Sequence, residues 1–90
     1  MEKKREETRV AVIAIVLENS EFADKVNDLL HEYSHFIIGR MGIPYRQRGI
    51  SIISVAVDAP QDVISTLSGK IGNINGISAK TVFSNVISDE

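Results

Sequence analysis

Residues able to bind an anion are concentrated in one short segment of the chain. Residues 33–57 contain three arginines and no carboxylate. A guanidinium group can hold a carboxylate or a phosphate through two parallel hydrogen bonds, and the nearby glycines allow a bulge or a close approach of the backbone to a ligand. We therefore expect ligand-binding residues here, namely Gly39, Arg40, Met41, Gly42, Tyr45, Arg46 and Arg48. The same composition also suits an edge strand that charge and Pro44 protect against aggregation.

Two histidines form the second candidate site, for a metal ion. His31 and His35 are four residues apart, with Glu32 between them. On one continuous helix this spacing would place both imidazoles on the same face. Two histidines are too few for a structural site, and the pair straddles the expected end of a helix, where their partial positive charge is favourable. We predict no metal centre here, although a second copy could supply two more histidines.

The sequence offers no catalytic constellation. Cysteine is absent, and no serine lies in a G-x-S-x-G motif. The carboxylates are scattered over the predicted helices and tails, so no acid–base pair stands out. Gly69, Gly72 and Gly76 match neither a dinucleotide fingerprint nor a phosphate loop. We predict a protein that is not an enzyme and needs no cofactor.

Apolar periodicity predicts four strands and two helices. The strands are Arg9–Leu17, His35–Tyr45, Ile50–Val57 and Ile77–Phe83. The first helix is expected to start at Asn19 or Ser20 and to bury an apolar stripe ending at Tyr33, and the second to start near Pro60 and end at Gly72. The order βαββαβ indicates an α+β, ferredoxin-like fold, in which two helices cover one face of a four-stranded antiparallel sheet. The first and third strands are then central, and the strand holding Pro44 is an edge.

The length allows one domain. We place it at residues 9–84, between a disordered arm at residues 1–8 and a tail at residues 85–90. The formal net charge of −2 argues against general nucleic-acid binding. No apolar run approaches the length of a membrane helix, and the start of the chain lacks the apolar stretch of a signal peptide. We therefore expect a cytoplasmic protein without a membrane partner.

The two central strands are apolar on both faces, although the helices can cover only one. An isolated two-layer domain should carry polar residues on its bare face. Exposing apolar surface costs roughly 25 cal/mol per Å². We therefore predict a homodimer or higher oligomer whose interface includes Val10, Val12, Ala14, Ile50 and Ile52. The alternative is that the N-terminal arm masks this face.

The run HEYSHFIIGRMGIPYRQRGISIISV, residues 31–55, resembles the signature of the small ACT-like proteins known as iron-only hydrogenase system regulators. Its most specific part is IIGRMGIPY, residues 37–45, and the likeness extends from about Arg9 to Phe83. The resemblance implies a ferredoxin-like fold, self-association through sheets or edges, and a regulatory role.

The predicted fold is more distantly similar to ACT domains, which bind amino acids at subunit interfaces. Their turn after the first strand often contacts the ligand, which implies ligand contacts at Glu18, Asn19 and Ser20. This turn lacks the glycine that is common in amino-acid-binding members. The fold is also similar to the ligand-binding domain of nickel-responsive regulators, whose square-planar site needs a cysteine that this chain does not have.

Two functions remain in view. We expect a regulatory binding module, an oligomer that senses a small-molecule effector or docks onto a partner, linked by resemblance to iron-only hydrogenase expression or maturation. The alternative is a transcriptional regulator that binds nucleic acid through Arg40, Arg46 and Arg48, with Tyr45 available for stacking on a base.

Overall fold

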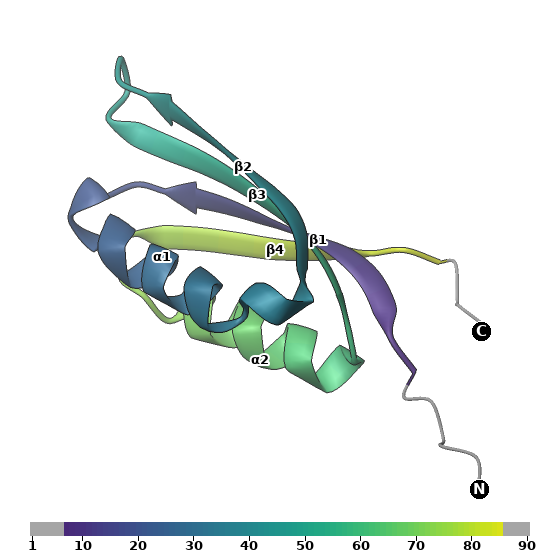
Figure 1. The fold of residues 1–90 in the computed structure, drawn as a ribbon. Coiled ribbons are helices and arrows are strands. Elements are labelled where there is room, and N and C mark those ends of the chain that lie inside the picture. The colour runs from purple at the N-terminus through teal and green to yellow at the C-terminus, as the bar shows by residue number, and fades with distance from the viewer. Residues whose placement is uncertain (1–6, 86–90) are drawn as a thin grey trace, which may run out of the picture.

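A computed structural model of the chain describes residues 7–85, and Figure 1 shows its strands and helices in the order βαββαβ. The strands are β1 (Arg9–Leu17), β2 (Ile37–Tyr45), β3 (Ile50–Ala59) and β4 (Ile77–Phe83). The helices are α1 (Ala23–Glu32) and α2 (Gln61–Gly72). Two single turns of 3-10 helix flank α1, η1 (Ser20–Phe22) before it and η2 (Ser34–Phe36) after it.

The four strands form one antiparallel sheet in the order β2-β3-β1-β4. The predicted ferredoxin-like α+β fold is confirmed, with β1 and β3 at the centre and Pro44 on the edge strand β2. An edge suits proline because its nitrogen carries no hydrogen to donate to a neighbouring strand. Both helices lie against the same face of the sheet (Figure 1).

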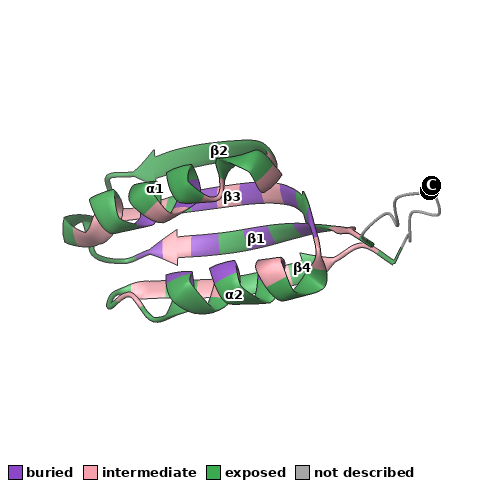
Figure 2. Ribbon diagram, turned by 60° about the horizontal axis from the view of Figure 1, so that its bottom comes forward, coloured by how far each residue is buried: buried purple, intermediate pink, exposed green. Residues whose placement is uncertain are grey.

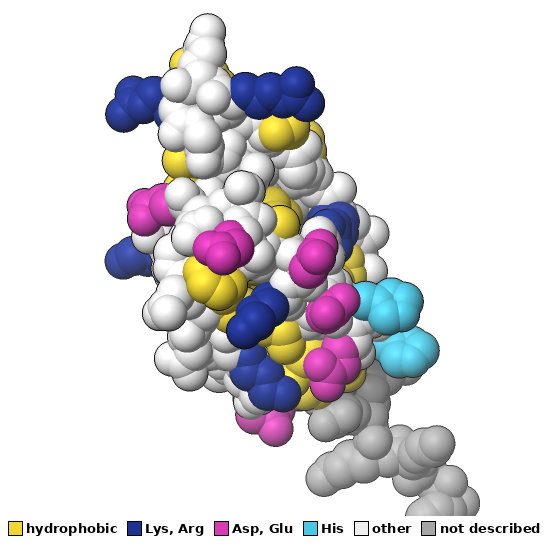
Figure 3. Space-filling model, turned by 90° about the vertical axis from the view of Figure 1, so that its left-hand side faces the viewer, with side chains coloured by type: hydrophobic (Ala, Val, Ile, Leu, Met, Phe, Trp, Pro, Cys, Tyr) yellow, Lys and Arg dark blue, Asp and Glu magenta, His cyan; other side chains and the backbone are white. Residues whose placement is uncertain are grey.

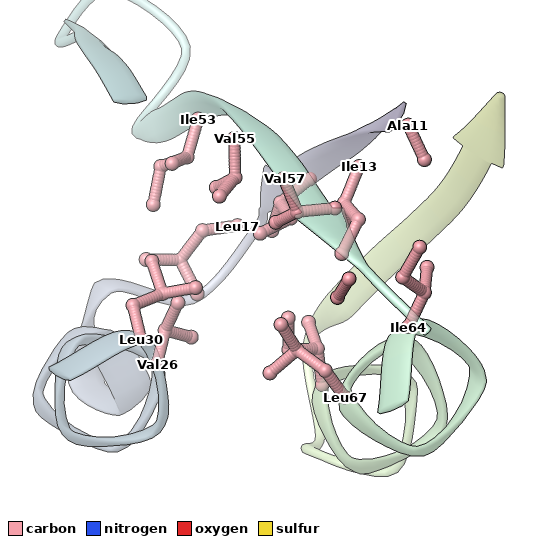
Figure 4. Packing of buried hydrophobic residues seen from close by; sticks show 13 residues of the cluster. Ala11, Ile13, Leu17, Val26, Leu30, Ile53, Val55, Val57, Ile64 and Leu67 are labelled. Carbon is pink, nitrogen blue, oxygen red and sulfur yellow. The ribbon is translucent and has the colours of Figure 1, made fainter. Parts of the chain in front are cut away.

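The core lies between that face and the helices. In β1 every second residue is buried. The β3 residues that pair with these buried positions continue the same apolar layer. Figure 4 shows Val26 and Leu30 of α1 directed toward the sheet, and Leu67 of α2 lying below Val57. The buried residues are Ala11, Ile13, Ile15, Leu17, Val26, Leu30, Ile53, Val55, Val57, Ala59, Ile64, Leu67 and Ile71.

The element boundaries differ from the sequence prediction at three places. The second strand starts at Ile37 rather than His35, because residues 34–36 form η2 and the ring of Phe36 packs 6.4 Å from that of Tyr33. The first helix is preceded by η1, whose N-cap is the side chain of Asn19. The third strand runs two residues further than Val57, since Ala59 is buried and pairs with Arg9.

A four-residue turn, residues 46–49, joins β2 to β3. The backbone N–H of Arg48 donates to the carbonyl of Tyr45, and that of Gly49 donates to the carbonyl of Arg46, both at 3.2 Å. Gly49 has a φ of 67°, which is strained for any residue with a side chain. The tip of this hairpin therefore carries Arg46 and Arg48 at one end of the sheet.

The predicted arm and tail fall largely outside this description, since residues 1–6 and 86–90 are not among the described residues. Within residues 7–85, no helix combines the length and apolarity needed to cross a membrane.

Candidate functional site

The sheet face that the helices leave uncovered is the main candidate surface, and we call it the bare face. Residues paired directly across antiparallel strands lie on the same face, so the strand register identifies its members. They are Val10, Val12, Ala14, Val16, Gly39, Met41, Ile43, Tyr45, Ile50, Ile52, Ser54, Ala56, Asp58, Ser78, Lys80 and Val82. Most are apolar, and several are strongly exposed, Val82 at 68% and Met41 at 60%.

All five residues predicted for an interface lie on the bare face. Val10, Val12 and Ala14 follow one another along β1, and Ile50 and Ile52 lie on β3. Val12 and Ile52 are about two-fifths exposed, whereas their chain neighbours Ile13 and Ile53 belong to the core. The alternation between buried and exposed positions therefore places these side chains at a solvent-facing surface.

A shallow hollow of about 250 Å³ lies on this surface near the β2 edge. It is lined by Gly39, Arg40, Met41, Ser54 and Ala56. The hollow exists because a glycine and two small residues lie side by side there, and nothing approaches within 4 Å of a Cβ atom added to Gly39. It could accept an apolar side chain or a small apolar ligand, with the Ser54 hydroxyl as a hydrogen-bonding group.

The three arginines do not form one patch. Arg40 pairs with Val55, a core residue, and so lies on the helix side of the sheet. Its guanidinium donates a 2.6 Å hydrogen bond to Oδ1 of Asn27 on α1. Arg46 and Arg48 lie at the hairpin tip, where Figure 3 shows two cationic side chains pointing to opposite sides.

The other predicted ligand residues are also divided between the two faces. Gly39, Met41 and Tyr45 lie on the bare face, while Gly42 pairs with Ile53 and lies on the helix side. Successive residues of a strand point to opposite faces, and a β-bulge between Ile37 and Gly39 shifts the register by one residue and so decides which face each residue of β2 occupies. Figure 2 shows β2 exposed along nearly its whole length.

The turn between β1 and η1 lies at the same end of the sheet as the hairpin tip, but on the β4 side. The backbone N–H of Glu18 donates a 2.7 Å hydrogen bond to the carbonyl of Gly76. The side chain of Asn19 accepts the backbone N–H of Glu21 at 3.0 Å, with Ser20 between them. These contacts brace the turn against the loop before β4, away from the Gly39 hollow.

The two histidines are exposed on the helix layer. His31 is in the last turn of α1, and His35 is in η2. Figure 3 shows both imidazoles on one side of the molecule. Among residues 7–85 no group of three or more histidine, cysteine, aspartate or glutamate side chains could hold a metal ion.

Sequence reasoning overlooked several members of the bare face, among them Ser54 and Ala56, which line the hollow. Ile43 is 50% exposed and pairs with Ile52, and Val82 pairs with Val12. Asp58 lies beyond the predicted end of the third strand and pairs with Val10. Period-two alternation along β2 and β4 was the available signal, but the glycines of β2 obscured it.

Comparisons with known proteins agree with this architecture. The sequence profile of the TM1266-like family, described as "Iron-only hydrogenase system regulator, putative", matches residues 9–81. Among solved structures, the uncharacterized protein TM1266 from Thermotoga maritima is 41% identical, with a TM-score of 0.81. That match covers 86% of this chain and 98% of the relative. The comparison with curated proteins gave no match. The matched range includes nearly the whole bare face.

Proposed function

This chain belongs to the TM1266-like family, and on that premise we propose that it is a regulatory binding module of an iron-only hydrogenase system that acts as a homo-oligomer and not as an enzyme. The observation that carries the proposal is the bare face. An antiparallel sheet that faces water normally carries polar residues on its solvent side. Most residues of the bare face are instead apolar, and several of them are strongly exposed.

Covering the bare face is favourable for a simple physical reason. Apolar surface removed from water contributes roughly 25 cal/mol per Å². Part of this gain is offset by the lost freedom of the associating molecules, so an oligomer of modest affinity results. Such an oligomer suits regulation, because a ligand or protein partner that binds at the same face shifts the equilibrium between free and associated chains.

The Gly39 hollow gives the module a place where a small effector could act. It opens on the bare face, so a ligand bound there would lie at the interface between subunits. The separation of Arg40 from Arg46 and Arg48 disfavours the nucleic-acid alternative, which needs the three cations on one surface.

Analytical ultracentrifugation at micromolar concentration tests the oligomer. We expect a dimer or larger species, and Val12→Lys should convert it to a folded monomer, because a charge cannot be buried unpaired in an apolar interface. Glu21→Lys, an exposed substitution in η1, is the control and should leave the mass unchanged. A wild-type chain that sediments only as a monomer would contradict the proposal.

A thermal-shift screen of amino acids, nucleotides and metal ions tests the effector. A ligand at a hundred times its dissociation constant should add roughly 2.7 kcal/mol to the free energy of unfolding. If no class of ligand shifts the melting temperature of an oligomeric wild type, docking to a protein partner becomes the better account of the regulatory role.

A further inference from the structure

On the β2 and β3 half of the bare face, large and small side chains occupy opposite ends. Toward the hairpin, the register aligns Ile43, Ile52 and Val16 in one row across β2, β3 and β1. Two rows further from the hairpin, it aligns Gly39 with Ala56. The face therefore has a ridge at one end and the hollow at the other.

Between them runs a middle row. It consists of Met41, Ser54, Ala14 and Lys80, one from each strand. Lys80 ends the row at the β4 edge, where its long side chain can keep the ammonium group in water.

A second copy fits this pattern if it is turned end for end. A two-fold axis that lies between two facing sheets and runs along the middle row places the β2 and β3 part of the ridge over the hollow of the other copy. Ile43 then faces Gly39 of the second copy, and Ile52 faces Ala56. Two-fold interfaces are self-complementary in this way, since each copy supplies both the ridge and the hollow. Facing sheets pack about 10 Å apart, close enough for such side chains to interdigitate.

Charge supports the same orientation. Asp58 is exposed on the bare face near the end of β3 that lies far from the hairpin. The hairpin tip at the other end carries Arg46 and Arg48. Turning a second copy end for end places Asp58 of each copy over Ile50 of the other, next to the hairpin tip and within the length of an arginine side chain from it. An axis along the strands would instead place Asp58 over Val10 of the second copy.

The available area is sufficient. With the usual spacing between strands and rise per residue, the bare face measures about 500 Å² per copy. Two covered faces then bury about 1,000 Å², the size at which specific interfaces begin.

We propose that a second copy of this chain covers the bare face in the end-for-end orientation, with Ile43 and Ile52 entering the Gly39 hollow and Asp58 meeting Arg46 or Arg48 of the other copy. This inference rests on the proposed homo-oligomer and adds its geometry. It also assigns the hollow to an aliphatic side chain of the second copy, so an effector that binds there must displace that side chain.

Charge reversal tests the orientation in sedimentation experiments. Asp58→Arg alone and the pair Arg46→Glu with Arg48→Glu should each weaken dimerisation by about tenfold or more, since like charges then face each other. An equimolar mixture of the two variants should form heterodimers with wild-type affinity, because both contacts between residue 58 and the hairpin tip again join opposite charges. The chain carrying all three substitutions should dimerise by itself for the same reason. Asp28→Arg, on α1, is the control and should dimerise normally.

A second pair of variants tests the hollow. Gly39→Val should fill it and weaken dimerisation without unfolding the chain, because a Cβ atom at Gly39 meets nothing within 4 Å. Gly42→Val places the same side chain in equally open space on the helix side of β2 and should leave dimerisation unchanged.

The outcomes separate the two proposals. If wild type dimerises but the charge variants dimerise equally well, or if their mixture and the triple variant fail to recover, the end-for-end orientation is wrong while the homo-oligomer stands. Equal dimerisation by Gly39→Val and wild type would overturn the assignment of the hollow. A wild-type monomer would overturn both proposals.

Discussion

Gly76 lies so close to Asn19 that a Cβ atom on Gly76 would stand 2.8 Å from the Cβ of Asn19. Gly76 also has a φ of 77°, a conformation that residues with side chains adopt only at a cost. The loop before β4 therefore holds the turn after β1 through a contact that only glycine permits, and the hydrogen bond from Glu18 to Gly76 depends on it.

Gly76→Ala should accordingly destabilise the fold. Strain at positive φ and the clash with Asn19 together should lower the free energy of unfolding by about 2 kcal/mol or more. Urea denaturation measures the change. Gly69→Ala is the control, because Gly69 lies inside α2 with open space around it, and alanine should raise the stability there by roughly 0.5–1 kcal/mol. Equal changes in the free energy of unfolding for Gly76→Ala and Gly69→Ala would contradict the close contact between Gly76 and Asn19.

Much of the fold was predictable from local signals. The runs Arg9–Leu17 and Ile77–Phe83 are strands with the predicted bounds, because β-branched and apolar residues continue to the turn residues on either side. Both helices also lie where the sequence predicted them, and each buries apolar residues against the sheet, Val26 and Leu30 in α1 and Ile64 and Leu67 in α2. The positions of strands and helices follow from the spacing of apolar residues within one segment, and this spacing can be read from the sequence alone.

The candidate site was less predictable, because it depends on pairing between segments. The bulge between Ile37 and Gly39 decides which face each residue of β2 occupies, and a one-residue shift exchanges the two faces. Arg40 was therefore grouped with Arg46 and Arg48 by proximity in sequence, although it lies against α1. The contact between Asn19 and Gly76 likewise joins two turns that are distant in the chain.

Adjacent isoleucines on β3 should respond differently to the same substitution. Ile53→Ala removes a core side chain and should lower the free energy of unfolding by about 2–5 kcal/mol. Ile52→Ala changes an exposed residue of the bare face and should cost the monomer less than about 1 kcal/mol, while it weakens self-association. Denaturation at a protein concentration that favours the monomer, together with sedimentation, measures both effects. If Ile52→Ala lowers the free energy of unfolding of the monomer as much as Ile53→Ala does, Ile52 is not an exposed residue of the monomer.

The hydrogen bond between Arg40 and Asn27 should stabilise the fold weakly. Both side chains are exposed, so a double-mutant cycle with Arg40→Ala and Asn27→Ala should give a coupling of about 0.5 kcal/mol. Arg46→Ala paired with Asn27→Ala is the matched control and should show no coupling. Zero coupling between Arg40 and Asn27 would mean that this guanidinium is available to a ligand.

Tyr33 should make the stability depend on pH in the alkaline range. The ammonium of Lys70 lies 5.4 Å from the centre of the Tyr33 ring, and the pKa of Lys70 is raised, first by a hydrogen bond to Tyr33 and then by the charge of Tyr33. A raised pKa in the folded state stabilises the fold fully below the ordinary lysine value of about 10.4, and this stabilisation is lost as pH rises through the raised value. The stability difference between wild type and Tyr33→Phe should therefore be constant at neutral pH and shrink in strong alkali.

An NMR titration of Lys70 checks this directly. Tyr33→Phe should lower the pKa of Lys70 toward the ordinary value, since the hydroxyl group that accepts the hydrogen bond is lost. Glu32→Gln is the comparison variant and should lower the pKa of Lys70 by less, because the carboxylate of Glu32 is the weakest of the groups that raise it. A pKa of Lys70 that does not respond to Tyr33→Phe would rule out the hydrogen bond as the main cause. The difference in stability between that variant and the wild type should then be the same at every pH.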